Sequence, residues 1–583
     1  MSAPETPERH RDQTFINGSI LTMDGPTPSY AEAVTICGGK IVFVGAAADA
    51  RDRFPQAELR DLEGAALLPG FIDAHSHLSF AFELAGQVNV AAPPAGRCTD
   101  IPSILAALND FRASRNVPED AWIIGYGYDQ ETLAEDRHIT KADLDAQFPN
   151  HRVMLVHVSS HGAVLNSAAL AWAGVDSSTP TPDGGIISRM PGTQEPAGLL
   201  METAYIHLVA SRMPRPAQAE RLQLLDAAQQ MYASNGYTHA QDGFATAADL
   251  DFYQAAVEAG LFYLDVAALG SFLEAGSWVG NPRYRVNSYA GGPTSGGFKI
   301  AGMKILHDGS PQGRTAYLRE PYLHGGPDGQ SPWRGEPTIP FAELAATVQQ
   351  GIDAGLQVFT HANGDAAIDD VIRALDLTGI TTADDRRPVV IHSQFQRPDH
   401  LGEYARLGIS PSYFTNHAYF WGDVHIHNVG YERAAFISPM KSALGHGLTV
   451  SNHTDFPVTA LDPFFVLWSA MSRTTRSGVV LGPEERIDAY TALASMTTGP
   501  AYQMFEEGRK GRIAEGLLAD FVIVSADPLQ VDTDKITGLR VLETIKEGVT
   551  VFKAPEAPKA RSGPEFHGFH PTEPTSPARP GHD

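Results

Sequence analysis

Eight short apolar runs, each ending in polar or ionisable residues, recur along the middle of this 583-residue chain. They are LLPGFIDAHSHL, YTHAQDG, FYLDVAAL, FKIAGMKILHDG, LQVFTHANGD, PVVIHSQF, ISPSYFTNH and LTVSNHTDF. Most are separated by stretches long enough to hold a helix. A barrel of alternating strands and helices places its chemistry at the carboxyl ends of the strands. The pattern therefore predicts an α/β fold of the (β/α)8 TIM-barrel class.

The remaining segments predict three additions to this barrel. Short strands broken by Gly and Pro at both chain ends are expected to pair as one sandwich. About 160 residues separate the first run from the second, so an insertion, or lid, is expected there. Seven prolines in the last 30 residues predict a disordered tail. The predicted parts are a β-sandwich domain over residues 10–68 and 510–553, the barrel over 69–85 and 216–509, an α/β insertion over 86–215 and the tail over 554–583.

Composition excludes several kinds of partner. With 43 basic and 68 acidic residues the net charge is −25, which disfavours nucleic acid and anionic membranes. The apolar runs are shorter than the ~20 residues of a membrane span, and the polar N-terminus lacks the apolar stretch of a signal peptide. Cys37 and Cys98 cannot form a disulfide framework or a thiolate zinc cluster. We expect a cytoplasmic protein with a small-molecule substrate and with any metal held by His and carboxylate. A homodimer is the expected assembly, because twofold dimers are the commonest.

Two histidines end the first run. His75 and His77 flank one residue, and the repeat of two along a strand puts both imidazoles on one face, within reach of one metal ion. A second pair with this spacing, His425 and His427, lies in the polar stretch WGDVHIHNVG, which is more typical of a loop or a helix start. The first pair is expected to bind metal, and the second is expected to consist of solvated surface histidines.

Other runs end in further candidate ligands. His361 ends the fifth run and His392 the sixth, although a single histidine there could also be a core residue. Asp455 ends the eighth run, which lies beside the first once a barrel closes, so it is expected next to His75 and His77. A carboxylate there can ligate metal and take a proton from a bound water as the general base. The alternative role for Asp455 is capping of the following helix.

Lys304 is a cation near the end of the fourth run. An ammonium group repels metal ions and is costly to bury without a partner. Two alternatives follow: the side chain points outward, or CO2 carboxylates the neutral amine. The resulting carbamate has two oxygens that could bridge two metals.

Substrate contacts are expected from two regions. The segment PSYFTNHAYFWGD is rich in aromatic rings that could line a pocket for an apolar or aromatic substituent, or could pack against neighbouring helices. The candidates are His417, Tyr419 and Trp421 from this segment, Arg314 from DGSPQGRTA, and His161 with Asn166 from the insertion.

A family resemblance rests on several motifs together. They are LLPGFIDAHSHL, MKILHDGSPQGRTAYLREPY, HANGDAAID, VVIHSQ, SNHTDFPV and GRIAEGLLADFVIVSADPL, spread over most of the chain. As a set they resemble the metal-dependent amidohydrolase superfamily, in particular amidohydrolase family 3 with its N-substituted formamide deformylases and exoenzyme-regulatory-protein-like members. Relatives often have Ser or Asn directly before the aspartate, where this chain has Thr454. A strand-face argument places His453 on the same side as Asp455.

The resemblance implies a binuclear hydrolase. His75 and His77 would hold a buried metal and His361 and His392 an exposed one, with carboxylated Lys304 as the bridge. Asp455 would be ligand and base. A metal-bridged hydroxide would attack the carbonyl of an amide-type C–N bond, and protonated Asp455 would pass its proton to the leaving nitrogen. The metals would be two divalent ions, with zinc favoured over manganese, iron or cobalt. Ester, lactone or phosphotriester hydrolysis, and a non-catalytic regulatory protein, are the alternatives.

Overall fold

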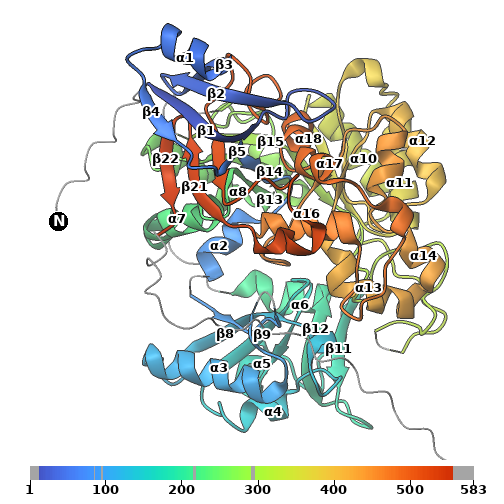
Figure 1. Ribbon diagram of the computed structural model, residues 1–583. Helices are drawn as coiled ribbons and strands as arrows, with labels where there is room; N and C mark the ends of the chain where they lie inside the picture. The colour runs from blue at the N-terminus through green and yellow to red at the C-terminus, as the bar shows by residue number, and fades with distance from the viewer. Residues whose placement is uncertain are drawn as a thin grey trace, which may run out of the picture.

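Three β-sheets organise the chain in the computed structural model (Figure 1). It describes residues 12–84, 86–93, 96–213, 218–289, 296–327 and 329–555. A sheet from both chain ends lies at the top of Figure 1, the predicted barrel region lies in the middle, and the insertion lies at the bottom. The tail predicted to be disordered falls, from residue 556 onward, outside the described residues. In the described part of the chain, no helix has the length and apolar character that crossing a bilayer requires.

The central sheet contains eight parallel strands, adjacent in chain order. Each predicted run contributes one strand. The sheet curls until the segments after its two outer strands meet: the N–H of His77 donates to the carbonyl of Phe456 (2.8 Å), and that of Asp455 donates to the carbonyl of His75 (3.2 Å). The strands are β6 (Phe71–Ile72), β13 (Tyr237–Ala245), β14 (Asp265–Ser271), β15 (Phe298–Leu306), β16 (Val358–Ala362), β17 (Val389–His392), β18 (Ser410–Tyr413) and β19 (Ser451–Asn452).

Amphipathic helices cover the outside of the parallel sheet. In α11 (Asp365–Leu377), Ile368, Val371 and Leu375 recur at intervals of three and four and are buried on one face. That face packs on α10 (Phe341–Asp353) and β16. Outside the insertion, the other helices after β6 are α2 (Leu78–Leu84), α7 (Gln218–Ala233), α8 (Ala247–Glu258), α9 (Ala275–Trp278), α12 (Pro398–Leu407), α13 (Asn416–Val429), α14 (Tyr431–Ala435), α15 (Met440–Gly445), α16 (Pro463–Ser472), α17 (Ala489–Ala494) and α18 (Thr498–Gln503).

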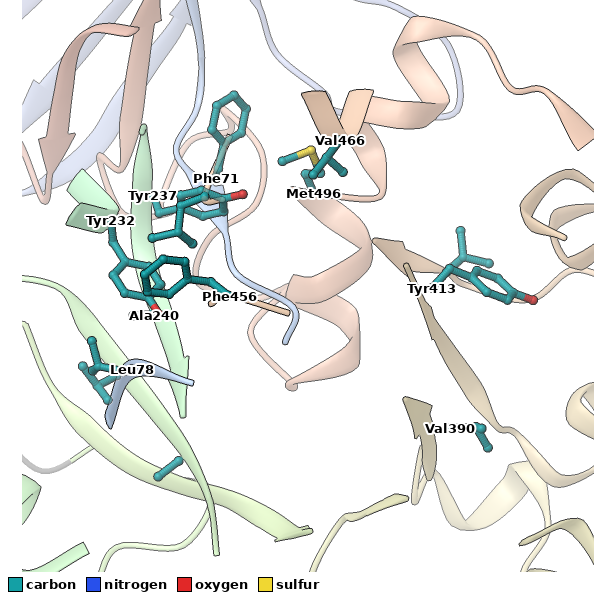
Figure 2. Packing of buried hydrophobic residues seen from close by; sticks show 14 of the residues in the cluster. Phe71, Leu78, Tyr232, Tyr237, Ala240, Val390, Tyr413, Phe456, Val466 and Met496 are labelled. Atoms are coloured by element: carbon teal, nitrogen blue, oxygen red, sulfur yellow. The ribbon is translucent and has the colours of Figure 1, made fainter. Parts of the chain in front are cut away.

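Buried aromatic rings fix the segments that carry the candidate ligands. Phe71 lies edge-on to Tyr237, with ring centroids 6.0 Å apart, and Tyr232 meets Phe456 at 6.1 Å (Figure 2). Each ring removes a large apolar area from water, and such pairs add favourable edge-to-face contacts. Phe456 directly follows Asp455, so this cluster holds the end of the eighth run against the first.

The two chain ends share one sheet of eight strands. β5 from the N-terminal part pairs antiparallel with β20 from the C-terminal part, as the predicted association of the ends requires. The second layer of a sandwich stays a prediction. The strands are β1 (Gln13–Leu21), β2 (Tyr30–Cys37), β3 (Lys40–Gly45), β4 (Glu58–Asp61), β5 (Ala66–Pro69), β20 (Phe521–Val524), β21 (Val541–Lys546) and β22 (Val549–Lys553), with α1 (Ala47–Arg53) beside β2 and β3.

The insertion contains a six-stranded sheet and its own apolar cores. Trp421 of α13 donates from its indole nitrogen to Oδ2 of Asp129 (3.2 Å), which ties the insertion to the central part. The strands are β7 (Val88–Asn89), β8 (Trp122–Tyr128), β9 (Arg152–His157), β10 (Gly162–Leu165), β11 (Gly185–Arg189) and β12 (Pro196–Glu202), and the helices are α3 (Ile101–Ser114), α4 (Lys141–Asp145), α5 (Ser167–Ala173) and α6 (Thr203–Leu208).

Candidate metal centre

Asp455 lies between the two histidines of the first run. Its Oδ1 is 3.5 Å from Nε2 of His75 and 3.4 Å from Nε2 of His77. One potential ligand atom from each of the three residues lies within 4.8 Å of the other two. The ends of the first and last runs therefore lie side by side, as the sequence predicts. Asp455 is not the cap of the following helix, because Asp462 accepts the N–H groups at the start of α16.

His392 and His361 complete a ring of imidazoles. Nε2 of His392 lies 3.9 Å from Oδ2 of Asp455, and the rings of His361 and His392 are 4.6 Å apart. Nδ1 of His361 lies 3.1 Å from Oδ1 of buried Asp308, a contact that orients the ring. Asp308 also accepts the backbone N–H of Asn363 (2.9 Å). Sequence reasoning missed Asp308, although it lies at the end of the fourth run, in the triplet HDG.

Lys304 points into the centre rather than outward. Its Nζ lies 3.2 Å from Nε2 of His75, and the residue is only 2% exposed. Burial lowers the pKa of its amine to about 7, although the negative charge of Asp455 acts in the opposite direction. The side chain therefore lies among the predicted ligands, and its lowered pKa makes the neutral amine accessible near pH 7.

These residues fit metal ions. Burial lowers the pKa of His75 and His392 well below the ordinary value, so both imidazoles are neutral, as metal ligands must be. Burial raises the pKa of Asp455, but its interactions with neighbouring His77 outweigh this effect and leave the pKa lowered, so the carboxylate is ionised. Oδ1 of Asp455 and Nδ1 of His392 are buried with no hydrogen-bond partner among the described residues. A cation would satisfy such acceptors.

The backbone is strained at two of these residues. His392 has φ 71° and Asp455 has φ 52°, both in the left-handed region that disfavours a residue with a Cβ. Such conformations cost on the order of 1–3 kcal/mol each and cluster at functional sites, where they aim side chains.

His453 is another histidine at the centre. Its ring lies 5.2 Å from that of His75 and 5.1 Å from that of His392, and it is 2% exposed. Neither ring nitrogen has a hydrogen-bond partner in the described part of the chain. Its position two residues before Asp455 agrees with the strand-face argument.

His417 and Trp421 contact each other, and His417 contacts His425 rather than a candidate ligand. Nδ1 of His417 is 3.0 Å from Nε2 of His425, and its ring packs on Trp421 at 4.5 Å. His425 is fully buried, so the prediction of a solvated surface histidine was wrong for it. His427 is exposed and stacks on His324.

The remaining substrate candidates are more scattered. Tyr419 packs against Phe465 and Trp468 of α16, in an aromatic cluster away from the ligands. The guanidinium of Arg314 lies 3.4 and 3.3 Å from the carbonyl oxygens of residues 324 and 325. Asn166 is buried and caps α5. The structure thus does not bring these three side chains together at the metal centre.

His161 of the insertion does reach the centre. Its ring lies 6.0 Å from that of His361, and its Nδ1 is 3.0 Å from Oε2 of Glu202. Glu202 gave no signal in the sequence, because it lies 41 positions away and only the pairing of β10 with β12 brings the two together.

A cavity of about 310 Å³ lies between the insertion and the central part. Its wall includes Tyr126 and Val158 from the insertion, and Trp421 and Phe456 from the segments after β18 and β19. Arg476 contributes a guanidinium to the lining. The volume suits a small apolar substituent, and Phe456 places the cavity next to Asp455.

Comparison with known proteins identifies the family. The sequence profile of the amidohydrolase family matches residues 58–552. The chain belongs to the amidohydrolase family. The resemblance inferred from the motifs is thereby confirmed.

Relatives of this amidohydrolase have been named. The N-substituted formamide deformylase of Arthrobacter pascens is 28% identical over 549 residues, which are 93% of this chain and 98% of the deformylase. The exoenzymes regulatory protein AepA of Pectobacterium carotovorum subsp. carotovorum is 24% identical over 406 residues, 67% of this chain and 82% of AepA. An uncharacterised metal-dependent hydrolase from Pyrococcus horikoshii OT3 has a TM-score of 0.69 at 22% identity, over 90% of this chain and 99% of that one. This last likeness shows the fold.

Proposed function

We propose that this amidohydrolase cleaves a C–N amide-type bond other than a peptide bond. Two divalent metal ions would be required for the reaction, and zinc is the favoured metal. The observation that carries the proposal is the carboxylate of Asp455 held 3.4–3.5 Å from the imidazoles of both His75 and His77. A buried carboxylate shared by two histidines is a ligand set for a divalent metal and also a base beside it.

Two groups of residues would hold the metals. His75 and His77 would bind the first ion and His361 and His392 the second, while Lys304, carboxylated on Nζ, would bridge them. The inward position of Lys304 supports this role, since it lies within 3.2 Å of His75. Bound divalent ions would supply an activated water nucleophile and polarise the scissile carbonyl.

Asp455 moves the proton in this scheme. Its carboxylate accepts a proton from the attacking water and then donates it to the leaving nitrogen, which departs as an amine. The left-handed backbone at Asp455 supports the role, because it holds the carboxylate toward the histidines at an energetic cost.

The substrate is proposed to be an N-substituted amide or formamide. The name of the Arthrobacter relative, which is similar over 93% of this chain, supports the formamide. We propose that the cavity beside Trp421 and Phe456 receives the apolar substituent. The insertion would act as a lid, because Asp129 binds Trp421 and His161 lies beside His361.

Hydrolysis of esters, lactones or phosphotriesters is the second candidate function. A metal-activated water can attack carbon or phosphorus centres alike. A regulatory protein without catalysis is the third, and the name of the AepA relative motivates it. Retention of all six candidate ligands favours an enzyme.

Metal analysis and assay test the proposal together. Protein purified without chelators is expected to contain about two metal ions per chain, and to hydrolyse N-substituted formamides and acyl amines faster than the matched esters. Dipicolinate treatment should remove metal and activity, and zinc or manganese should restore both. Protein that takes up no metal from either salt would refute the ligand assignment. Metal-loaded protein that is inert toward amides but cleaves esters would favour the second function.

A further inference from the structure

One arginine lines the cavity between the insertion and the central part. The cavity has a volume of about 310 Å³, and most of its wall is apolar. Tyr126 and Val158 contribute from the insertion, and Trp421 and Phe456 contribute from the central part. Arg476, in the segment after α16, adds a guanidinium to this wall. Guanidinium groups are permanently charged, and a single polar group in an apolar pocket orients the ligand that the pocket receives.

The charge of Arg476 lies at the cavity wall. Its guanidinium carbon is 5.1 Å from the ring centroid of Phe420, which is itself part of the wall, and 5.8 Å from that of Tyr419. A guanidinium over a ring keeps its N–H donors in its own plane, where a ligand can meet them. Burial raises the pKa of Asp129, another residue of the wall, and the charge of Arg476 is one of the effects that oppose this rise.

The guanidinium has no carboxylate partner within the described residues. Arg476 is partly buried, yet it makes neither an ion pair nor a hydrogen bond in that part of the chain. Asp129 is engaged elsewhere: its Oδ1 accepts the backbone N–H of Glu131 (3.0 Å), and its Oδ2 accepts the indole N–H of Trp421 (3.2 Å). Partial burial of a charge without a partner is unfavourable. The positive charge is therefore available to a ligand in the cavity.

An anchored turn holds Arg476 in this position. The residues on either side of it bind Asp423 of α13: the hydroxyl of Thr475 donates to Oδ1 (2.8 Å), and the backbone N–H of Ser477 donates to Oδ2 (3.0 Å). The N–H of Thr475 also donates to the carbonyl of Val479 (2.8 Å), which closes the turn. Asp423 is thus bound by the neighbours of Arg476 rather than by Arg476 itself. A backbone fixed in this way lowers the entropy that the arginine loses when it binds a ligand.

We infer that Arg476 binds a carboxylate at the end of the apolar substituent of the amide substrate. This inference rests on the proposed function. The carboxylate accepts hydrogen bonds from the planar fork of the guanidinium, a geometry that arginine provides. The apolar chain packs against Trp421 and Phe456, and Phe456 directly follows Asp455, so the amide lies toward the metal centre. The preferred substrates are then N-acyl amino acids in which an apolar chain separates the carboxylate from the amide.

Matched substrates test this selection. N-formyl ω-amino acids, from N-formylglycine to N-formyl-6-aminohexanoate, are each compared with the uncharged isostere in which an isopropyl group replaces the carboxylate. The metal-loaded native enzyme is expected to have a kcat/KM about tenfold or more higher for the carboxylate at one or more chain lengths, because a hydrogen bond to a charged group contributes that much. Absence of this preference at every chain length would contradict the inference.

Variants at position 476 separate charge from packing. Arg476→Met keeps a long apolar stem, so the unfolding midpoint and the metal content should stay the same, while the carboxylate-to-isostere ratio of kcat/KM falls about tenfold or more. Arg476→Lys keeps the charge without the fork, and its ratio should lie between the two. Arg373→Met is the matched control: Arg373 is exposed on α11, and its guanidinium lies 4.0 Å from the ring of Phe341, outside the cavity wall. Its ratio should equal that of the native enzyme.

Binding of hexanesulfonate gives a readout that does not depend on turnover. This probe joins an apolar chain to an anion that coordinates metals weakly, and saturation-transfer NMR should detect its binding to the metal-loaded native protein but not to Arg476→Met. If the enzyme cleaves amides and Arg476→Met leaves the substrate ratio unchanged, the inference is overturned and the proposed function stands.

Protein that cleaves no amide would refute the proposed function instead. Hexanesulfonate then decides the anion site separately. Binding that Arg476→Met abolishes would support the site, whereas equal binding by both proteins, or none by the native protein, would overturn it.

Discussion

The amine nitrogen of Lys304 lies 3.2 Å from Nε2 of His75, and both residues are almost fully buried. A permanent ammonium would be unfavourable beside a metal ligand, whereas a carbamate in the same place would attract cations. The buried position of this lysine is what the proposed carboxylation requires.

Replacement of Lys304 by Met should remove the bridge. We expect metal content to fall from about two ions per chain to one or fewer, and kcat/KM for an N-substituted formamide to fall at least about 100-fold. Elemental analysis and steady-state kinetics measure both. Lys141→Met, which removes a partly buried lysine of the insertion paired with Glu195, is the control. A Lys304→Met enzyme with two metals and native activity would contradict the bridging role.

Asp455→Asn should retain the fold and lose catalysis. Loss of a general acid–base group lowers rates about 10²- to 10⁴-fold, and we expect kcat to fall in this range. Asp462→Asn is a matched control: Asp462 caps α16, so this variant should lose about 1 kcal/mol of stability while kcat is unchanged. Equal losses of kcat in both variants would mean that Asp455 acts through the fold.

The buried ion pair between Asp265 and Lys510 predicts a large effect on stability. Both side chains are 1–2% exposed, and Lys546 also lies 3.2 Å from Asp265. Asp265→Asn leaves buried ammonium groups without their carboxylate, so the free energy of unfolding should fall by about 3–5 kcal/mol. Urea denaturation measures this change. Lys535→Met, in an exposed pair, should leave the unfolding midpoint unchanged, and a similarly small shift for Asp265→Asn would refute the prediction.

Asp369 predicts acid-sensitive stability. Burial raises the pKa of this carboxyl, but hydrogen bonds from His400, Arg397 and Arg319 outweigh burial and leave the pKa well below its ordinary value. Its contribution is therefore complete above the unfolded pKa of about 3.9 and is lost as the pH falls toward the lower folded pKa. Asp369→Asn should be less stable than the native protein at pH 7, with a difference that shrinks below about pH 4. Urea titrations at pH 7 and below about pH 4 measure the difference in the free energy of unfolding between the two proteins. A difference that does not change with pH would count against this assignment.

Residue pattern anticipated which side chains lie together at the centre, because the position of each along its strand is a local property. His361 and His392 each follow a short apolar strand, and the end of a parallel strand is where a side chain can reach the centre of the sheet. The pairing of Asp455 with His77 followed from joining the last strand to the first. The tertiary structure adds that the segments after the first and last strands are in hydrogen-bonding contact.

Residue pattern failed where the element type was misjudged. His425 and His427 were expected in a loop or at a helix start, but they lie within α13, where two residues apart means nearly opposite faces. One side chain is consequently buried against His417 and the other is exposed. The aromatic segment is divided in the same way, so that Trp421 lines the cavity while Tyr419 packs on α16.

The sequence by itself determined the chemistry available to this protein: strand-end histidines, a carboxylate and a lysine, each placed by a local repeat of apolar residues. Only the tertiary structure decided which distant groups meet, as with Glu202 behind His161, Asp308 behind His361 and Lys304 turned inward. Such contacts depend on strand pairing and burial across long stretches of chain. No local pattern encodes them, because the free energy that favours them comes from packing of the whole fold.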